Sequence, residues 1–526
     1  MSAEAENLSS IARRAAARQD WATVDGCAQQ LLRLDEADPE AQFLAGLVHK
    51  AAERPARATE AFEKALQRDP ARYDAAIELA GQHSMARRNA AAVELIARYE
   101  RMLVNSPRYL DMAGTVYTEI GLPERAWPLY RKANELQPGV DLFAANLAAC
   151  GVYLGKIAEA REIYTELLRR NPNHRRNHYH LARLEPAKDD THVEQMKEVL
   201  QADELPDDRN VFIYYALGKE LEDLGRWSEA FSWYRKGADA VGAVARYDVE
   251  ADLAIIDKVT EVCGREWLAE GGAAQAGAGA GQVPIFIVGL PRTGTTLVER
   301  ILSSHSQVAS LGETQFMQMA IRRHSGVKSV EPMSPSMIEE AAKQPVSVIA
   351  RAYLDAVAYR LGPKPMFIDK LPYNFLFLGF IAKAWPEARI VYLRRNPMDT
   401  CFAMYKQVFT WAYKFSYSLE HLGRYYAAHE RLRRHWKELL GGRMIEIRYE
   451  DLVSNQAEQT RALLDVLGLA FEEQCLSFDE NRAPTTTASS VQVRQKIHSR
   501  SVERWRFFET ELAPLKESLV RNGVTI

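Results

Sequence analysis

The chain has 526 residues, more than one compact hydrophobic core usually holds, so we expect two or three domains. Apolar residues make up 47% and charged residues 26% of the sequence, the proportions of a globular protein that folds in water. The 67 basic and 70 acidic residues leave a net charge of −3, which gives no overall attraction to nucleic acid or to an acidic membrane surface. We therefore expect neither a nucleic-acid partner nor a membrane, while a local basic cleft stays compatible with this balance.

The five cysteines are scattered and odd in number, and none forms a Cys-x-x-Cys pair. They indicate no disulfide framework, which favours a reducing compartment. The polar N-terminal segment has no apolar signal region, and no run long enough to span a membrane occurs in the chain. We therefore expect a cytoplasmic location.

Prolines recur through the first half of the chain at intervals of 31, 37, 31 and 34 residues, at Pro39, Pro70, Pro107, Pro138 and Pro172. Small residues and an aromatic residue recur at matching offsets before them, as in Ala126, Tyr130 and Ala133. Small residues let two antiparallel helices approach closely, an aromatic ring fills the space beside them, and proline ends the second helix. These segments resemble tetratricopeptide repeats.

The resemblance implies a helical solenoid over residues 1–265, whose concave groove would receive a protein or peptide. A role as a scaffold or dimerisation arm is equally compatible with the sequence. A Gly/Ala-rich stretch, which has no side chains able to build a core, makes 266–282 a linker. Beyond it, short apolar runs alternate with amphipathic stretches, which predicts an α/β domain with a central parallel sheet over 283–526.

The first apolar run of this second domain continues into PIFIVGLPRTGTTL at 284–297, which has the pattern of a phosphate-binding loop. A strand, a glycine turn and a helix start would aim backbone N–H groups and the positive end of the helix dipole at one anion. Gly289 and Gly294 have the spacing of a Walker A motif, but Thr295 occupies the position of its lysine. The missing lysine disfavours a kinase or an ATPase. The anion ligands expected here are Arg292, Thr293, Gly294, Thr295 and Thr296.

This loop resembles the 5′-phosphosulfate loop of sulfotransferases that use 3′-phosphoadenosine 5′-phosphosulfate (PAPS). Four later motifs extend the likeness over most of 284–508. The order of repeats and second domain is similar to that of bacterial tetratricopeptide-repeat sulfotransferases, whose catalytic domain is similar to that of tyrosylprotein sulfotransferases. The resemblance implies an α + α/β chain with a P-loop-like sulfotransferase fold, PAPS as co-substrate and no metal; no cluster of His, Cys and Asp residues suggests otherwise.

Two motifs contain residues that the resemblance assigns to catalysis. In LGET at 311–314, Glu313 matches the general base that removes the proton of the acceptor hydroxyl. In FIDKLPYN at 367–374, Lys370 matches the lysine that contacts the sulfuryl group and the leaving phosphate. Asp369 is interpreted as an orienting partner rather than as a base.

In RIVYLRRNPMDT, Arg395 matches the arginine of the 3′-phosphate motif. Ala403 stands where a serine usually contacts the same phosphate, and the loss of one neutral donor costs about 1 kcal/mol. Thr400 and Cys401 are candidate substitutes by proximity in sequence. Tyr449 matches a tyrosine on the nucleotide side, although a packing role at the end of a strand is equally compatible with its position.

The last motif is a polar stretch at 487–505, which resembles the loop that closes over the nucleotide. Ser489 matches a serine near the sulfuryl group, with a catalytic role, and Ser490 matches one near the nucleotide. Positive charge in this stretch would come from Arg494, Lys496 and Arg504, of which Arg494 is assigned to the nucleotide.

These motifs predict an enzyme that transfers the sulfuryl group from PAPS to a hydroxyl acceptor, while the repeats recruit a protein or peptide. A protein tyrosine is the acceptor that the resemblance suggests, and sugars or small metabolites stay open. One alternative is a P-loop phosphotransferase, which the missing lysine disfavours. The other is a non-catalytic repeat adaptor with a degenerate nucleotide-binding domain, which only Ala403 favours.

Overall fold

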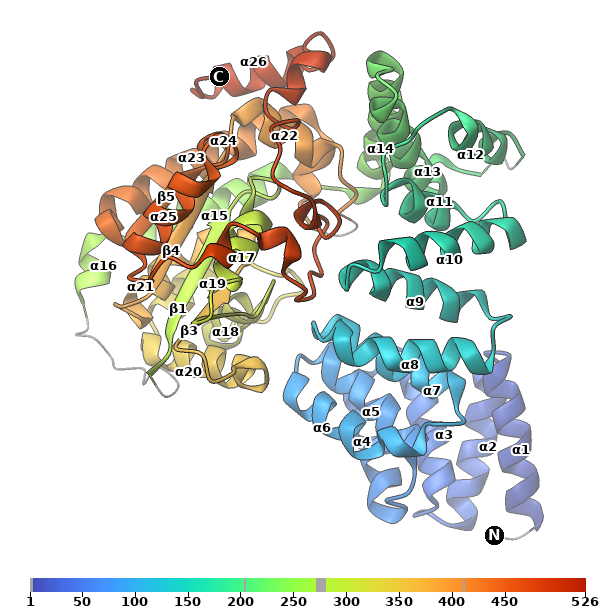
Figure 1. The fold of residues 1–526 in the computed structure, drawn as a ribbon. Helices are drawn as coiled ribbons and strands as arrows, with labels where there is room; N and C mark the ends of the chain where they lie inside the picture. The colour runs from blue at the N-terminus through green and yellow to red at the C-terminus, as the bar shows by residue number, and fades with distance from the viewer. Residues whose placement is uncertain (1–2, 203–204, 271–280, 410–411) are drawn as a thin grey trace. The chain divides into compact units, whose positions relative to one another are not determined.

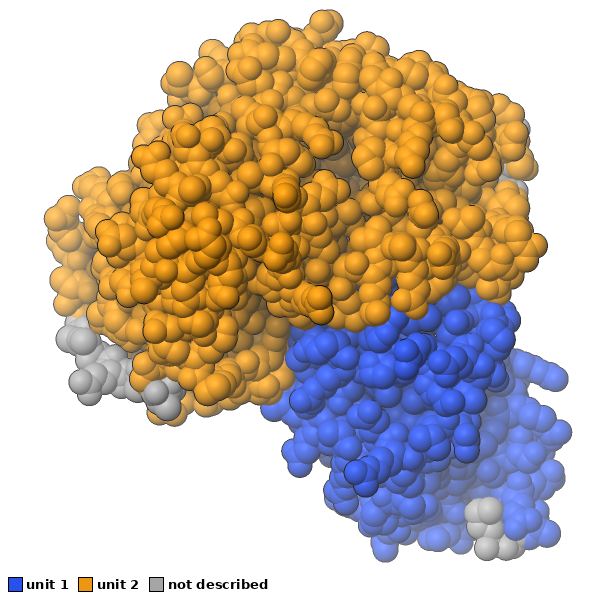
Figure 2. Space-filling view, in the orientation of Figure 1, with its two compact units in different colours: residues 1–151 blue, residues 152–526 orange. Residues whose placement is uncertain are grey.

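The structure is a computed structural model that describes residues 3–202, 205–270, 281–409 and 412–526. It forms two compact units, residues 1–151 and 152–526 (Figure 2). The boundary between these units lies well before the predicted linker 266–282, most of which falls outside the described residues. Whether 283–526 forms an independent domain therefore stays a prediction.

The first unit is helical, and its helices pack as antiparallel pairs. A Cβ atom at Gly46 of α3 would lie 2.4 Å from the ring of Phe62 in α4, and one at Gly114 of α7 would lie 2.8 Å from the ring of Tyr130 in α8. Only glycine permits these two close approaches, which is the packing that the repeat pattern predicts. The helices are α1 (Ala3–Ala17), α2 (Trp21–Leu34), α3 (Pro39–Ala51), α4 (Pro55–Arg68), α5 (Tyr73–Met85), α6 (Asn89–Tyr99), α7 (Pro107–Glu119), α8 (Pro123–Leu136) and α9 (Asp141–Tyr153), whose last two residues belong to the second unit.

The second unit begins with further helices of the same kind. Gly218 of α13 faces the ring of Tyr234 in α14, where a Cβ atom would lie 2.6 Å from a ring carbon. These helices are α10 (Ile157–Arg170), α11 (Arg175–Ala182), α12 (Thr191–Ala202), α13 (Asp207–Asp223), α14 (Trp227–Ala245), α15 (Val249–Val262) and α16 (Arg265–Ala269). Within the described residues, no helix is both long and apolar enough to cross a bilayer.

A five-stranded sheet follows, with the strand order β2-β3-β1-β4-β5 among the described residues, and every neighbouring pair is parallel. The strands are β1 (Val283–Gly289), β2 (Val308–Ser310), β3 (Met366–Asp369), β4 (Arg389–Arg394) and β5 (Met444–Arg448). The helices of this part are α17 (Thr295–Ser303), α18 (Phe316–Ser325), α19 (Pro335–Ala342), α20 (Val346–Val357), α21 (Leu378–Ala384), α22 (Pro397–Tyr405), α23 (Leu419–Leu440), α24 (Tyr449–Ser454), α25 (Gln456–Val466) and α26 (Ala513–Arg521). An all-helical N-terminal region and a C-terminal parallel α/β region confirm the predicted fold class.

Both faces of the sheet are buried, which explains why its strands are continuous apolar runs. Ile285 and Ile287 of β1 join a core with residues of α17 and α25. Phe286 and Val288 face the other way, into a larger core with residues of α20, α21 and α23. The strands therefore lie between two layers of helices, and their carboxyl ends meet at one edge of the sheet (Figure 1).

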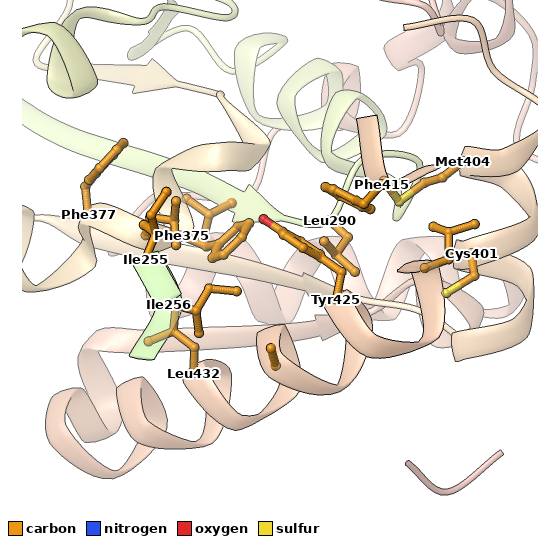
Figure 3. Close-up of a cluster of buried hydrophobic side chains, with 14 of the residues drawn as sticks. Ile255, Ile256, Leu290, Phe375, Phe377, Cys401, Met404, Phe415, Tyr425 and Leu432 are labelled. Atoms are coloured by element: carbon orange, nitrogen blue, oxygen red, sulfur yellow. The ribbon is translucent and has the colours of Figure 1, made fainter. Parts of the chain in front are cut away.

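The larger core continues into the helices that precede the sheet. Ile255 and Ile256 of α15 pack in one buried cluster with Phe375 and with Leu432 of α23 (Figure 3). Gly379 of α21 lies close enough to Cys263 that a Cβ atom there would be 2.9 Å from the cysteine Cβ. The helices directly before the predicted linker therefore share a core with the sheet.

Candidate active site

The carboxyl ends of three neighbouring strands place the predicted cations at one edge of the sheet. β1 ends at Gly289, three residues before Arg292, while Lys370 directly follows β3 and Arg395 directly follows β4. Parallel α/β sheets bind ligands in the crevice at this edge, where the chain order reverses. The strand order places β1 between β3 and β4, so this is the reversal point.

The loop after β1 adopts the backbone conformation that the motif requires. Gly289 and Gly294 have φ angles of +146° and +99°, which side-chain-bearing residues rarely adopt. A Cβ atom at Gly289 would lie 2.7 Å from the Leu393 carbonyl oxygen, and one at Gly294 would lie 2.7 Å from the Tyr449 ring. α17 starts at Thr295 with no hydrogen bond from a capping side chain. Its first backbone N–H groups are therefore oriented as anion donors.

Arg292 has a left-handed backbone, with φ at +68°, and its guanidinium donates to the Ser489 hydroxyl and, at 2.7 Å, to Gln492 Oε1. Burial, helped by the nearby charges of Arg183 and Arg395, lowers its pKa to about 10. Within the described part of the chain Arg292 forms no ion pair with a carboxylate. A cation held this way lacks a counter-ion, which an anionic ligand would supply.

Lys370 is fully buried and lies between two carboxylates. Its Nζ donates to Glu313 Oε1 at 2.6 Å and lies 3.4 Å from Glu299 Oε2. Burial alone would lower the pKa of the ammonium, but the charges of Glu313 and Glu299 outweigh it and raise the pKa above its ordinary value. The structure thus brings the predicted base and the predicted lysine into direct contact, with Lys370 charged.

Asp369 is buried beside this pair and bonds to three neutral groups. It accepts hydrogen bonds from Thr314 Oγ1 at 2.6 Å, Tyr353 OH at 2.8 Å and Asn374 Nδ2 at 3.1 Å. Burial raises the pKa of its carboxyl to about 7. These bonds tie β3 to the Glu313 loop and to α20, in agreement with an orienting role.

Arg395 lies over the ring of Tyr449, with its guanidinium carbon 4.8 Å from the ring centre. It donates to the carbonyl oxygens of Arg292, at 2.8 Å, and of Ser501, while its buried Nε has no hydrogen-bond partner. The Tyr449 hydroxyl is 2.7 Å from Ser501 Oγ. An unpartnered guanidinium nitrogen beside an aromatic ring and two hydroxyls suits a phosphate.

The predicted closing loop contributes its serines in different ways. Ser489 accepts from Arg292, whereas Ser490 is buried and its backbone N–H donates to the Thr487 carbonyl. Arg494 donates to the carbonyl oxygens of Tyr153, at 2.8 Å, and Ala483, at 3.3 Å. These contacts anchor the loop, so the assignment of Arg494 to the nucleotide stays a prediction.

Arg504 has an acidic partner away from the phosphate loop. Its Nε lies 3.0 Å from Glu222 Oε1, and the same carboxylate accepts from Lys406 at 2.7 Å. Glu222 is buried and belongs to α13, so this ion cluster connects the helices before the sheet to residues after β4.

Both proposed substitutes for the serine at Ala403 are engaged within the protein. The Thr400 hydroxyl donates to the Asn396 carbonyl at 2.9 Å, and Cys401 is buried in the apolar cluster of Figure 3. Ser501, which the motifs did not select, has the hydroxyl that bonds to Tyr449.

Sequence reasoning also missed Glu299, Arg300 and Gln492. Arg300 is buried and donates to the carbonyl oxygens of Ala483, at 2.6 Å, and of Asn481. Glu299 and Arg300 are charged residues inside an otherwise apolar helix directly after the phosphate loop, which was a usable signal. Gln492 offered no such signal.

Residues 284–473 match the sulfotransferase family, and residues 39–72 match a tetratricopeptide repeat. An uncharacterized protein of Aquifex aeolicus (strain VF5) is 29% identical over 421 residues, covering 78% of this chain and 54% of that protein. A protein-tyrosine sulfotransferase of Drosophila melanogaster is 24% identical over 231 residues, covering 42% of this chain and 46% of its own. The chain thus spans about half the length of these curated relatives.

Among solved structures, the sulfotransferase domain from the curacin biosynthetic pathway aligns with a TM-score of 0.31 at 16% identity, covering 47% of this chain and 99% of that domain. The chain combines N-terminal tetratricopeptide repeats with a sulfotransferase-family domain that resembles protein-tyrosine sulfotransferases, which confirms the resemblance drawn from the motifs.

Proposed function

We propose that the protein is a PAPS-dependent sulfotransferase that uses Glu313 as its general base. The observation that supports this most strongly is the 2.6 Å contact between Glu313 and the buried Lys370, at the same sheet edge as Arg292 and Arg395. A base, a buried ammonium and two guanidinium groups at one edge are the groups that sulfuryl transfer needs.

The residues of the site fit the two anionic ends of PAPS. The uncapped start of α17 and the side chain of Arg292 would hold the 5′-phosphosulfate, together with the hydroxyls of Thr295 and Thr296. Arg395, whose Nε has no partner, would hold the 3′-phosphate beside Tyr449. When bound, PAPS supplies a sulfuryl group on a phosphate leaving group.

Glu313 would take the proton of the acceptor hydroxyl as the new oxygen–sulfur bond forms. The bond between sulfur and the bridging oxygen breaks, and its electron pair stays on the phosphate, where Lys370 and Arg292 stabilise the charge. The Lys370 ammonium, which donates to Glu313 in the structure, would then donate to the phosphate instead. Its contact with Glu299 would keep the ammonium in place during this change. Ser489, bonded to Arg292, would contact the sulfuryl oxygens.

A protein tyrosine is our preferred acceptor, because the domain resembles protein-tyrosine sulfotransferases. The repeats would recruit the protein or peptide that carries it. We place the activity in the cytoplasm, because five cysteines without a disulfide favour a reducing compartment. These finer assignments rest on resemblance and on the repeat architecture.

Transfer of ³⁵S from labelled PAPS to a panel of tyrosine peptides, sugars and small phenols tests the proposal. We expect label on at least one peptide with the wild-type protein. Label on sugars alone would overturn the tyrosine acceptor, and label on no acceptor in the presence of bound PAPS would overturn the enzymatic role.

A further inference from the structure

Arg183, at the C-terminal end of the repeat-type helix α11, extends to the candidate active site. Its Nη2 donates to the carbonyl oxygen of Ala488 at 2.8 Å, across 305 positions of sequence. Its guanidinium carbon lies 5.1 Å from the ring centre of Tyr179, which precedes it on the same helix. The side chain is therefore held in one place by an aromatic face and a backbone acceptor.

The residue after Ala488 is Ser489, which accepts from Arg292. Arg183 and Arg292 consequently bond to adjacent residues of one loop, and their charges lie close together. The lowered pKa of Arg292, to which Arg183 and Arg395 both contribute, agrees with this geometry. Three guanidinium groups thus gather beside the phosphate loop.

None of these three arginines forms an ion pair with a carboxylate in the described ranges, although surface arginines of this chain commonly do. Arg292 and Arg395 bond only to neutral oxygens, as does Arg183. Asp399 is near enough to Arg395 for their charges to interact, but among the described residues no carboxylate pairs directly with any of the three. Like charges held close together repel one another, and the repulsion is relieved when an anion binds between them. The arrangement is that of a site for a multiply charged anion.

The loop that contains Ser489 also contacts the helices before the sheet. The backbone N–H of Thr485 donates to the Tyr153 carbonyl at 3.0 Å, and Arg494 donates to the same carbonyl at 2.8 Å. A Cβ atom at Gly155 would lie 2.7 Å from the Arg494 guanidinium. Helices that precede the sheet therefore set the position of the loop that presents Ser489.

We propose that Arg183 is a third arginine of the anion site and binds the 5′-phosphosulfate end of the nucleotide. The inference rests on the proposed function, and it makes the repeat region part of the nucleotide site in addition to any role in recruitment. Because Arg183 lies on the Arg292 side of the loop, it should act on the 5′-phosphate and leave the 3′-phosphate to Arg395.

Isothermal titration with adenosine 3′,5′-bisphosphate and with adenosine 3′-monophosphate tests this assignment. We expect Arg183→Gln to weaken binding of the bisphosphate about tenfold and to leave binding of the 3′-monophosphate unchanged. Arg183→Lys, which keeps the charge, should restore part of the loss. Arg176→Gln is the matched control, because Arg176 lies on the same helix, over the ring of Phe212.

Equal affinity of Arg183→Gln and wild type for the bisphosphate would overturn the inference, as would an equal loss for both ligands. If Arg183→Gln fails to fold, Arg183→Met replaces it, because methionine keeps the packing on Tyr179 without the charge. The same change in affinity for the bisphosphate, and the same unchanged affinity for the 3′-monophosphate, are expected of Arg183→Met. A wild-type protein that binds neither ligand would instead overturn the proposed function, and the inference with it.

Discussion

Glu313 and Lys370 are 57 positions apart in the sequence, yet their side chains meet because β2 and β3 are neighbours and end at the same edge of the sheet. Each residue follows its strand within a few positions, so a local motif was enough to select both. The contact between them shows in addition that Lys370 stays charged although it is buried, since two carboxylates face it.

Replacement of Glu313 separates binding from chemistry. We predict that Glu313→Gln binds adenosine 3′,5′-bisphosphate within about twofold of wild type and loses at least about 100-fold in sulfuryl transfer, because an amide cannot accept the proton. The rate of ³⁵S transfer and the titrated affinity measure the two effects. Glu339→Gln, at an exposed ion pair on α19, is the control, and transfer by Glu313→Gln at the native rate would contradict the base assignment.

Replacement of Arg395 tests the opposite end of the site. We predict that Arg395→Ala weakens binding of adenosine 3′,5′-bisphosphate at least about tenfold and changes the affinity for adenosine 5′-monophosphate little, because only the first ligand has a 3′-phosphate. Titration of both nucleotides gives the ratio. Equal losses for the two nucleotides would show that Arg395 does not read the 3′-phosphate.

At the scale of elements, sequence reasoning located the phosphate loop and the strand ends because each depends on a short, local pattern. Arg183 and Ser501 escaped it because their roles depend on contacts between distant segments. The bond between Arg183 and Ala488, for example, spans 305 positions, and no local spacing records it.

Asp369 is buried at the end of β3, and its carboxyl makes the free energy of unfolding depend on pH. Burial raises the pKa of Asp369 from 3.8 to about 7, so the folded state binds more protons than the unfolded state between these values. Stability should therefore fall as the pH rises through this window, by about 2 kcal/mol between roughly pH 5 and 7.5, and level off above it.

We predict that Asp369→Asn removes this decrease, because the amide does not titrate. Urea transitions of wild type and variant at about pH 5 and pH 7.5 measure the difference. If both proteins lose the same stability over this range, the carboxyl of Asp369 does not have a raised pKa.

At the scale of the whole molecule, composition and repeat spacing predicted a helical region followed by a parallel α/β region, and both are present. They did not predict that the helices just before the linker share a core with the sheet. That arrangement depends on Ile255 and Ile256 of α15 packing against residues far later in the chain, such as Phe375 and Leu432 (Figure 3). Glu222, which holds both Lys406 and Arg504, adds a buried ionic contact.

Two fragments test where the folding unit begins. We predict that 152–526 unfolds cooperatively, whereas 283–526 aggregates or lacks a cooperative transition, because it exposes the surface under α15 and leaves the half-buried Lys406 without its carboxylate. Thermal melts by circular dichroism and gel filtration compare the two. Cooperative unfolding of 283–526 at the temperature of the longer fragment would support a boundary at the linker instead.

The most direct test of the proposed function is to measure which nucleotide the site binds. Isothermal titration of the whole chain with adenosine 3′,5′-bisphosphate and with ATP–Mg²⁺ distinguishes the three candidate functions. A sulfotransferase site without a Walker lysine should bind the bisphosphate tightly and ATP–Mg²⁺ weakly or not at all. Preference for ATP–Mg²⁺ would point to a phosphotransferase, binding of neither would point to an adaptor, and either result would contradict a PAPS-dependent sulfotransferase.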